Sequence, residues 1–314
     1  MSHLSLIKSF ALGDSVDGAF ILKTATIKET KDGNPYLDAT LADTSGEINC
    51  KQWSYNGPLG SADAGKIVIV AGKVTSYRDC LQLGADSIRL AVEADHVDVS
   101  QLIPMAPIDC AAMLDLIDCI VESISDDDYR AVCESMLQRH EDTFPTLPAA
   151  KSIHHAFIGG LLMHTGNMLQ IADYLAGLYP DTVDRDLLLA GTLLHDFGKV
   201  KEFSLSHLGL VVDYSTEGQL LGHLVLGAQE VAAVAESLNI PDEKKSLLQH
   251  MLLSHHGEPQ MGAAVTPVCV ESELLHLIDR IDSKTEIYRE SLDGIPKGEF
   301  TKRIFALDKR VYAH

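Results

Sequence analysis

Histidine and aspartate residues recur through the second half of the chain, mostly where apolar, helix-like segments end. The series is His164, His195-Asp196, His223, His255-His256 and Asp279. These side chains offer nitrogen and oxygen atoms and no sulfur, a donor set that suits Mn, Fe, Co, Ni or Zn used as a Lewis acid. It does not suit a structural thiolate zinc or an all-oxygen calcium site. The series therefore predicts a hydrolytic metal centre.

The adjacent pair His195-Asp196 is the centre of this prediction. Such a pair at a helix end can place an imidazole on one ion while the carboxylate bridges to a second ion about 3.5–4 Å away, an arrangement used to cleave phosphoesters. The pair follows the apolar segment 187–194 and precedes Gly198 and Lys199. We expect Gly198 to permit a tight exit from the helix and Lys199 to direct a cation at a phosphate. A lone histidine here would equally suit the core, so the complete series is what favours a ligand.

The order of these residues resembles that of the HD-domain phosphohydrolase superfamily. More narrowly, nearly the whole chain resembles the YhaM family of 3′-to-5′ exoribonucleases, in which an N-terminal OB domain precedes a C-terminal HD domain. The matching segments are 154–165 (HHAFIGGLLMHT), 193–199 (LLHDFGK), 222–223 (GH), 253–257 (LSHHG) and 275–279 (LHLID). The HHAxxGG stretch behind an OB domain is what narrows the resemblance from the superfamily to this family.

The resemblance also implies which residues hold metal. A first ion would have four ligands, with Asp196 as the bridge: His164, His195, Asp196 and Asp279. His223 and His255 would hold a second ion, with His256 as a further ligand or a phosphate contact. Adjacent residues on a helix point about 100° apart, so it stays open whether His255, His256 or both are ligands, and whether one or two ions bind. Mn is the divalent metal that we favour, with Fe, Co and Ni as alternatives.

For activity, the resemblance implies 3′-to-5′ hydrolysis of single-stranded RNA to nucleoside 5′-monophosphates by metal-activated water. Asp196, Lys199 and His256 would be the catalytic residues. Single-stranded DNA stays open as a second substrate. One alternative is an HD phosphohydrolase of small nucleotides or cyclic dinucleotides, although such an enzyme has little use for a strand-binding barrel. A non-catalytic single-strand binding module is a weaker alternative, because the ligand series is intact.

Two domains are expected to position these residues, since 314 residues is long for one compact core. Short alternating runs separated by turn residues extend from about residue 19 to residue 90. Residues 36–43 and 48–53 have the pattern of a hairpin, and further runs follow at 66–77 and 81–90. About five short strands indicate an all-β barrel of the OB type.

An all-α domain of the HD type is expected after this barrel. Pro104 and Pro107 punctuate a linker, after which apolar residues recur at helical spacing. The predicted domains are 1–100 (OB-type, nucleic-acid binding), 101–110 (linker) and 111–314 (helical phosphohydrolase). The predicted helices are 108–123, 126–140, 152–178, 184–197, 219–238, 242–256 and 268–290.

A barrel of this type binds single strands by stacking bases on exposed aromatic side chains beside a few cations. The candidates are Tyr36, Trp53, Tyr55 and Tyr77, near Lys51, Lys73 and Arg78. An aromatic residue in a small barrel is equally suited to the core, and we select Trp53, Tyr77 and Arg78 as nucleic-acid-binding residues. His155 is a further candidate for substrate contact, because nine residues of continuous helix would turn it away from His164 unless Gly159-Gly160 breaks the helix.

Composition limits the partners and the compartment. A formal net charge of -20 argues against binding polyanions by bulk electrostatics, so any attraction for nucleic acid must be local and salt-sensitive. The six cysteines are scattered without a Cys-x-x-Cys pair, which favours reduced thiols. No run approaches the roughly 20 apolar residues of a membrane span, and the first residues lack the layout of a secretion signal. We expect a cytoplasmic protein without membrane contact, and a homo-oligomer stays open.

Overall fold

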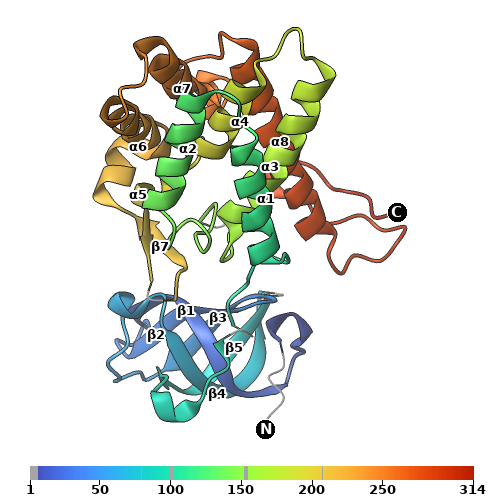
Figure 1. Ribbon diagram of the computed structural model, residues 1–314. Helices are drawn as coiled ribbons and strands as arrows, with labels where there is room; N and C mark the ends of the chain where they lie inside the picture. Colours follow the sequence, from blue (N-terminus) through green and yellow to red (C-terminus); the bar gives the residue numbers. More distant parts are fainter. Residues whose placement is uncertain (1–5, 79, 100–101, 152–154, 207) are drawn as a thin grey trace. The chain divides into compact units, whose positions relative to one another are not determined.

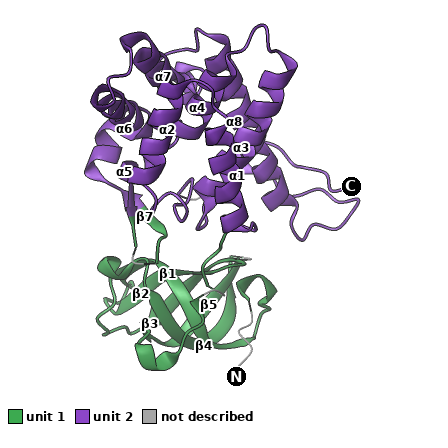
Figure 2. Ribbon diagram, viewed as in Figure 1, with its two compact units in different colours: residues 1–105, 205–212 green, residues 106–204, 213–314 purple. Residues whose placement is uncertain are grey.

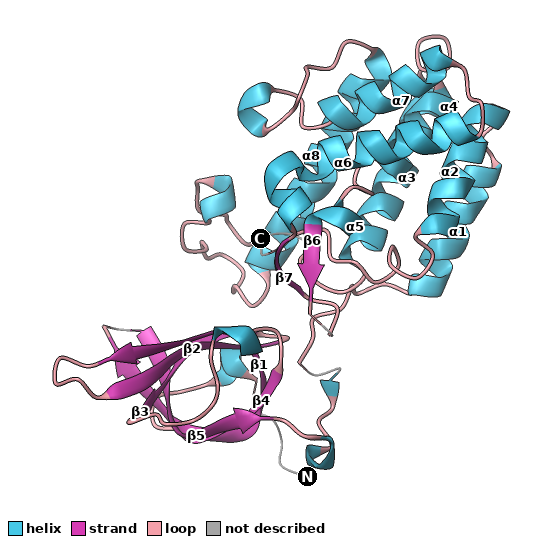
Figure 3. Ribbon diagram, turned by 90° about the vertical axis from the view of Figure 1, so that its left-hand side faces the viewer, coloured by secondary structure: helices cyan, strands magenta, loops and turns pink. Residues whose placement is uncertain are grey.

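The computed structural model describes residues 6–78, 80–99, 102–151, 155–206 and 208–314. The chain divides into two compact units (Figure 2). The first consists of residues 1–105 and 205–212, and the second consists of residues 106–204 and 213–314. Strands make up the first unit and helices dominate the second, as Figure 3 shows. Within the described ranges, no helix is long and apolar enough to cross a membrane.

The first unit is a closed five-stranded barrel. Its strands are β1 (Ser15–Glu29), β2 (Pro35–Asp43), β3 (Gly46–Trp53), β4 (Ile67–Tyr77) and β5 (Cys80–Leu90). They follow the order β1-β2-β3-β5-β4, and β1 closes the barrel by pairing antiparallel with β4. The predicted hairpin is confirmed, since Tyr36 on β2 lies opposite Trp53 on β3. Alternate residues point inward and form one apolar core, so the predicted OB-type barrel is also confirmed.

The second unit is built mainly from helices, labelled in Figure 1. They are α1 (Cys110–Glu122), α2 (Asp127–Arg139), α3 (Gly160–Leu178), α4 (Arg185–Leu194), α5 (Lys199–Glu202), α6 (Thr216–Ser237), α7 (Asp242–Ser254) and α8 (Val270–Leu292). The predicted helical class is confirmed. A short two-stranded sheet was not predicted, and it consists of β6 (Phe203–Leu205) and β7 (Val211–Tyr214).

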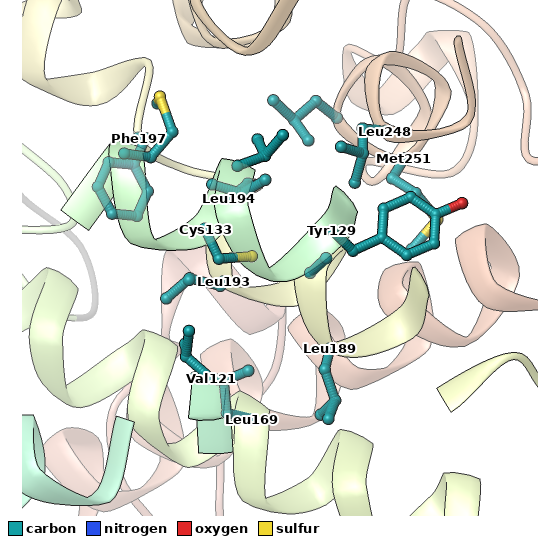
Figure 4. Close-up of a cluster of buried hydrophobic side chains, with 14 of the residues drawn as sticks. Val121, Tyr129, Cys133, Leu169, Leu189, Leu193, Leu194, Phe197, Leu248 and Met251 are labelled. Atoms are coloured by element: carbon teal, nitrogen blue, oxygen red, sulfur yellow. The ribbon is translucent and has the colours of Figure 1, made fainter. Parts of the chain in front are cut away.

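The central element of the helical unit is α4. All residues from Leu187 to Leu194 are buried, so this helix is apolar on every side. Figure 4 shows its leucines among side chains of the surrounding helices, with Val121 from α1, Cys133 from α2 and Met251 from α7. Phe197, just past the helix end, stacks on Phe144 with ring centroids 4.9 Å apart. This packing fixes the position of the His195-Asp196 turn.

Three predicted helix ends near the site are wrong. The helix expected over 152–178 begins at Gly160, because Gly159 has a left-handed backbone (φ 76°) that turns the chain before it. The helix expected over 184–197 ends at Leu194. The helix expected over 219–238 starts earlier, at Thr216, and bends at Gly222, whose φ of 72° lies outside the helical region.

Candidate metal centre

The Asp196 carboxylate lies at the centre of the histidine cluster, with two rings near each oxygen. Nε2 of His195 is 3.3 Å and Nε2 of His164 is 3.9 Å from Oδ2. Nε2 of His223 is 3.5 Å and Nε2 of His255 is 3.8 Å from Oδ1. The two oxygens thus belong to two separate groups of nitrogen donors. A carboxylate in this position is suited to bridging two cations.

Asp279 completes the first of these groups. Its Oδ1 is 3.4 Å from Nε2 of His164, and that nitrogen lies 3.3 Å from Nε2 of His195. Three helices supply the group, since His164 is in α3, His195 follows α4 and Asp279 is in α8. Both α3 and α4 pack against α8, so the site depends on the tertiary fold and not on one local motif.

Each of the four rings is oriented through its other nitrogen. Nδ1 of His195 is 2.8 Å from the Thr192 carbonyl oxygen, and Nδ1 of His255 is 2.8 Å from that of Leu252. Carboxylates orient the other two rings: Asp282 Oδ2 is 2.6 Å from Nδ1 of His164, and Glu202 Oε1 is 3.1 Å from Nδ1 of His223. When Nδ1 carries the proton, Nε2 presents its lone pair to the centre. Metal-binding histidines are normally held in this way.

Glycines make the close approaches in this arrangement possible. A Cβ on Gly198 would lie 2.0 Å from the carbonyl oxygen of His223. The backbone of Gly198 is helical (φ −57°), so the predicted tight exit does not explain why a glycine is needed here. The close contact with α6 explains it. A Cβ on Gly160 would likewise lie 2.0 Å from the carbonyl oxygen of His155. Both positions accept only glycine without moving a ligand-bearing segment.

The electrostatics of the cluster suit a cation. Burial raises the pKa of Asp196, but Lys199 and His195 outweigh it and hold that pKa well below the ordinary value. Burial lowers the pKa of His255 well below its ordinary value, and His195 and His256 add to this effect. Burial also lowers the pKa of His164, but Asp279 and Asp282 raise it overall to about 9. At neutral pH Asp196 is therefore ionised and His255 is neutral, which are the forms that bind metal, whereas His164 is protonated and releases its proton when a cation binds.

Unsatisfied atoms provide a test of whether a metal fits. The buried atoms Oδ1 of Asp196, Nε2 of His223 and Nδ1 of His256 have no hydrogen-bond partner within the described ranges. Buried polar atoms without partners are costly, and a bound cation would satisfy acceptors of this kind. The atoms of His223, His255 and His256 also lie within 4.8 Å of one another, as do those of His164, His195 and Asp196. The residues present thus fit a divalent cation.

The fold brings together all the metal ligands that the sequence predicts. Lys199 is also at the centre, but its Nζ is 2.6 Å from Oδ2 of Asp196, so its nearest partner is the carboxylate. His256 is half-buried beside His223, with ring centroids 5.2 Å apart. His276 lies beside this pair, and its Nδ1 is 3.0 Å from the carbonyl oxygen of His255.

His155 does not lie where a nucleic-acid contact is expected. Its side chain is fully buried, and its Nε2 is 3.5 Å from Oδ2 of Asp282. The ring is next to that of His164, with centroids 5.2 Å apart. A buried ring cannot stack on or bond to a strand at the surface, so we assign His155 to the support of His164. His154 lies outside the described residues.

The carboxylates that orient two of the rings, Glu202 and Asp282, were not predicted. Glu202 accepts bonds from both the backbone N–H and Nδ1 of His223, and Asp282 binds His164 and also Nδ2 of Asn167 at 3.0 Å. A signal existed for Asp282, which follows Asp279 by three residues and shares its helix face. Glu202 had none, because its partner is 21 residues away along the chain.

The barrel carries a second candidate site, which we call the aromatic patch. It consists of Tyr36, Lys51, Trp53, Tyr77 and Arg78. The rings of Tyr36 and Trp53 have centroids 4.9 Å apart, and Lys51 Nζ lies 5.3–5.8 Å from the centroids of all three aromatic rings. Arg78 lies 5.3 Å from the Tyr77 ring. Trp53, Tyr77 and Arg78 are exposed. The patch therefore offers ring faces and cations to solvent, which is what stacking of bases requires.

The fourth aromatic candidate belongs to the barrel core. Tyr55 is buried, and its hydroxyl oxygen accepts a hydrogen bond from the backbone N–H of Leu59 at 2.8 Å. Lys73 is exposed within β4 but has no ring contact in the described structure. These two residues are therefore not part of the patch.

Comparisons with known proteins agree with both units. Residues 161–284 match the family model described as HD domain. The 3'-5' exoribonuclease YhaM of Shouchella clausii (strain KSM-K16) is 38% identical over 307 residues, which cover 98% of this chain and 95% of that protein.

Part of the chain is also similar to solved OB-fold domains. The second OB-fold domain of replication protein A from Methanococcus maripaludis is 20% identical, with a TM-score of 0.23, over 28% of this chain and 98% of that one. An OB domain from Thermoplasma acidophilum is 18% identical, with a TM-score of 0.22, over 28% and 86%. Because both TM-scores are low, the assignment of the barrel depends on its strand order.

Proposed function

The chain belongs to the YhaM family of 3′-5′ exoribonucleases, and we propose that it removes nucleotides from the 3′ end of single-stranded RNA in a divalent-metal-dependent reaction. Water adds to the phosphorus of the last linkage, the bond from phosphorus to the preceding O3′ breaks, and that oxygen takes the proton. The released product is a nucleoside 5′-monophosphate. The observation that carries this proposal is the convergence of four oriented histidine Nε2 atoms on the two oxygens of Asp196.

The residues divide into two candidate ligand groups. His164, His195, Asp279 and Oδ2 of Asp196 would hold one ion. His223, His255 and Oδ1 of Asp196 would hold another, with the partly exposed His256 as a further ligand or a phosphate contact. When bound, the metal supplies Lewis acidity that activates water and neutralises phosphoryl oxygens. We favour Mn²⁺, with Fe, Co and Ni as alternatives, because the donors are imidazole and carboxylate.

The chain's own side chains would prepare the site for this chemistry. Asp282 and Glu202 keep two rings in the productive orientation, and Lys199 holds the central carboxylate from one side. Lys199 also adds positive charge where phosphoryl oxygens would gather. Burial of Asp196 and His195 excludes bulk water from the carboxylate, which strengthens these interactions.

The aromatic patch would bind the strand. Trp53 and Tyr77 offer ring faces for bases, while Lys51 and Arg78 offer cations for the backbone. Stacking does not distinguish ribose from deoxyribose, so we include single-stranded DNA as a second substrate. We propose a cytoplasmic location because all six cysteines are free thiols, as a reducing compartment requires.

A direct test uses 5′-end-labelled single-stranded RNA with Mn²⁺. We expect a ladder that shortens from the 3′ end, and loss of this activity in Asp196→Asn, which removes the central charge at little steric cost. Asp181→Asn, at an exposed position, is the matched control and should keep full activity. Full activity in Asp196→Asn would contradict the assignment of the metal centre.

One alternative function has an observation in its favour. The centre opens into a cavity of about 270 Å³, just below the roughly 300–1,000 Å³ of small-ligand sites, and a free nucleotide would suit it. Phosphate release from mononucleotides or cleavage of cyclic dinucleotides, with intact RNA, would favour this alternative. RNA binding without turnover would instead indicate a non-catalytic module.

A further inference from the structure

One face of α8 lines the cavity in front of the metal centre. The residues are Asp279, Arg280, Ser283, Lys284 and Ile287, spaced as neighbours on one side of a helix. Asp279 belongs to the candidate ligands, and the four that follow have no role in the function proposed above. Arg280 and Lys284 are exposed, whereas His164, Asp196 and His255 on the inner wall are buried. The two cations therefore lie toward the mouth of the cavity.

Among the described residues, Arg280 and Lys284 are also without a carboxylate partner, unlike many basic residues of this acidic chain. Neither is in an ion pair within the described ranges, whereas pairs such as Lys23–Glu47, Arg185–Asp173 and Lys244–Asp126 are common elsewhere. Lys199, the other basic residue deep in the cavity, is held by Asp196 at 2.6 Å. The chain has a net charge of -20, so two basic side chains beside the metal centre that have no acidic partner in the described structure are available to bind an anionic substrate.

Their spacing suits a single phosphate group. Residues four apart on a helix have Cβ atoms about 5–6 Å from each other, so both side chains can reach one anion. The half-buried Ser283 lies between them in sequence and adds a hydroxyl donor. Arginine and lysine together with a hydroxyl form a donor set typical of backbone phosphate contacts.

Position then decides which phosphate is bound. The scissile phosphate belongs at the inner wall, beside Asp196 and Lys199. Arg280 and Lys284 are one and five residues along α8 from Asp279, about 1.5 and 7.5 Å along the helix axis, and both are more exposed than Asp279. An anion held there is one linkage removed from the bond that breaks. In a 3′-end exonuclease it can only be the linkage on the 5′ side, because the released nucleotide has no phosphate beyond its 3′ hydroxyl.

We propose that Arg280 and Lys284, with Ser283, bind the phosphodiester on the 5′ side of the scissile linkage and make the enzyme selective for substrates that have one. This inference rests on the exoribonuclease function proposed above. It predicts that a trinucleotide is cleaved more efficiently than a dinucleoside monophosphate, which contains the scissile linkage alone.

The experiment compares UpU with UpUpU, and follows release of 5′-uridine monophosphate by chromatography with Mn²⁺ present. We expect the wild-type protein to have the higher kcat/KM for UpUpU. In the double variant Arg280→Gln/Lys284→Gln, kcat/KM for UpUpU should fall about tenfold through KM, because charge-assisted hydrogen bonds to the phosphate are removed. Values for UpU should not change. The salt dependence of KM for UpUpU should also weaken, by about 0.7 in the log–log slope for each phosphate that the protein no longer neutralises.

A second double variant controls for net charge. Arg139 and Lys302 are exposed, are in no ion pair within the described ranges and do not line the cavity. Arg139→Gln/Lys302→Gln should leave both substrates unaffected, and thermal melts should show that both double variants are folded.

Three results would overturn the inference, and they differ in what they say about the enzyme. An unchanged ratio of UpUpU to UpU cleavage in Arg280→Gln/Lys284→Gln would refute the subsite and leave the exoribonuclease function intact. An equal loss on both substrates would place the two cations on the scissile phosphate instead. A wild-type protein that releases no 5′-uridine monophosphate from either substrate would contradict the exoribonuclease function, and the subsite with it.

Discussion

His195 and Asp196 in the helical unit are 0% and 2% exposed, whereas Trp53 and Tyr77 on the barrel are 56% and 57% exposed. The histidine cluster is held by fixed partners, since each ring that faces Asp196 bonds to a carbonyl or a carboxylate through Nδ1. The aromatic patch is held by ring and cation contacts of about 5–6 Å that solvent can reach.

This difference in burial determines how each region should respond to substitutions. A buried cluster is organised before anything binds, so the loss of one member leaves other buried polar atoms without partners. An exposed patch contributes through several nearly independent contacts. Single changes should therefore have large effects in the helical unit and graded, salt-dependent effects on the barrel.

The largest effect is expected from Gly198→Ala. The new Cβ would meet the carbonyl oxygen of His223 at 2.0 Å and the backbone nitrogen of Gly227 at 2.7 Å, so the turn and α6 must separate. We expect a loss of about 3 kcal/mol in unfolding free energy, together with weaker Mn²⁺ binding. Urea denaturation and calorimetric titration with Mn²⁺ measure the two effects.

Gly177→Ala is the matched control for this change. Gly177 is exposed near the end of α3, and a Cβ there would meet nothing within 4 Å. Alanine should be neutral or stabilise the helix by up to about 1 kcal/mol. Equal stability of the two alanine variants would show that α6 is not fixed by Gly198.

The next largest effect concerns the orienting carboxylates. Asp282→Asn and Glu202→Gln retain the side-chain shape but remove the charges that hold the rings of His164 and His223. We expect each variant to bind Mn²⁺ about 10- to 100-fold more weakly, because the partners of metal-binding histidines usually have effects of that size. Titration calorimetry gives the affinity. Unchanged affinity in both variants would mean that the rings are fixed by packing alone.

A smaller effect should come from the ion pairs of Glu230, whose partner His140 packs against Phe197. Glu230 in α6 lies 3.1 Å from Nε2 of His140 and 3.0 Å from Nζ of Lys201. Burial raises the pKa of Glu230, but His140 and Lys201 outweigh it and lower the pKa to about 2, from 4.5 in the unfolded chain. A lowered carboxyl pKa stabilises the fold above pH 4.5, and this contribution disappears as the pH falls from 4.5 to about 2.

Glu230→Gln tests this contribution. The variant should be about 1.5–2 kcal/mol less stable at pH 7, and the difference from the wild type should shrink as the pH falls through that window. Denaturation curves between pH 7 and pH 3 provide the measurement. Glu236→Gln, at an exposed position on the same helix, should show little difference at any pH. A difference for Glu230→Gln that is independent of pH would refute the electrostatic origin.

The two regions also differ in how well the sequence predicts them. The ligand series His164, His195-Asp196, His223, His255 and Asp279 is an ordered pattern of chemically distinctive residues, so spacing alone indicates a common site. Gly198 was assigned to a turn, although the contact that requires it is the carbonyl oxygen of His223 in another helix. The spacing of residues along the sequence does not reveal a contact between two separate helices. For the same reason Glu202 was not found.

On the barrel, residue type alone could not separate core from surface. Trp53 and Tyr55 are two residues apart, and both were candidates for stacking. Trp53 ends β3 and is exposed, while Tyr55 turns inward and binds the backbone of Leu59. The direction of a side chain just past a strand end depends on the loop that follows, and no periodic pattern covers that loop. The strand pairing itself was predictable because alternation continues through β2 and β3.

The smallest effects should be found in the aromatic patch, and they make the contrast with the metal centre sharpest. Trp53→Ala and Tyr77→Ala should each weaken binding of single-stranded RNA by about 1 kcal/mol, roughly fivefold, which is the lower end for base stacking because both rings are exposed. Anisotropy titration with labelled RNA in EDTA measures binding without cleavage.

Arg78→Gln should reduce the salt dependence of binding, whereas the aromatic variants should not, since stacking releases no counterions. Mn²⁺ affinity should be unchanged in all three variants. If any one of these three changes abolished RNA binding completely, the patch would be preorganised in the same way as the metal centre.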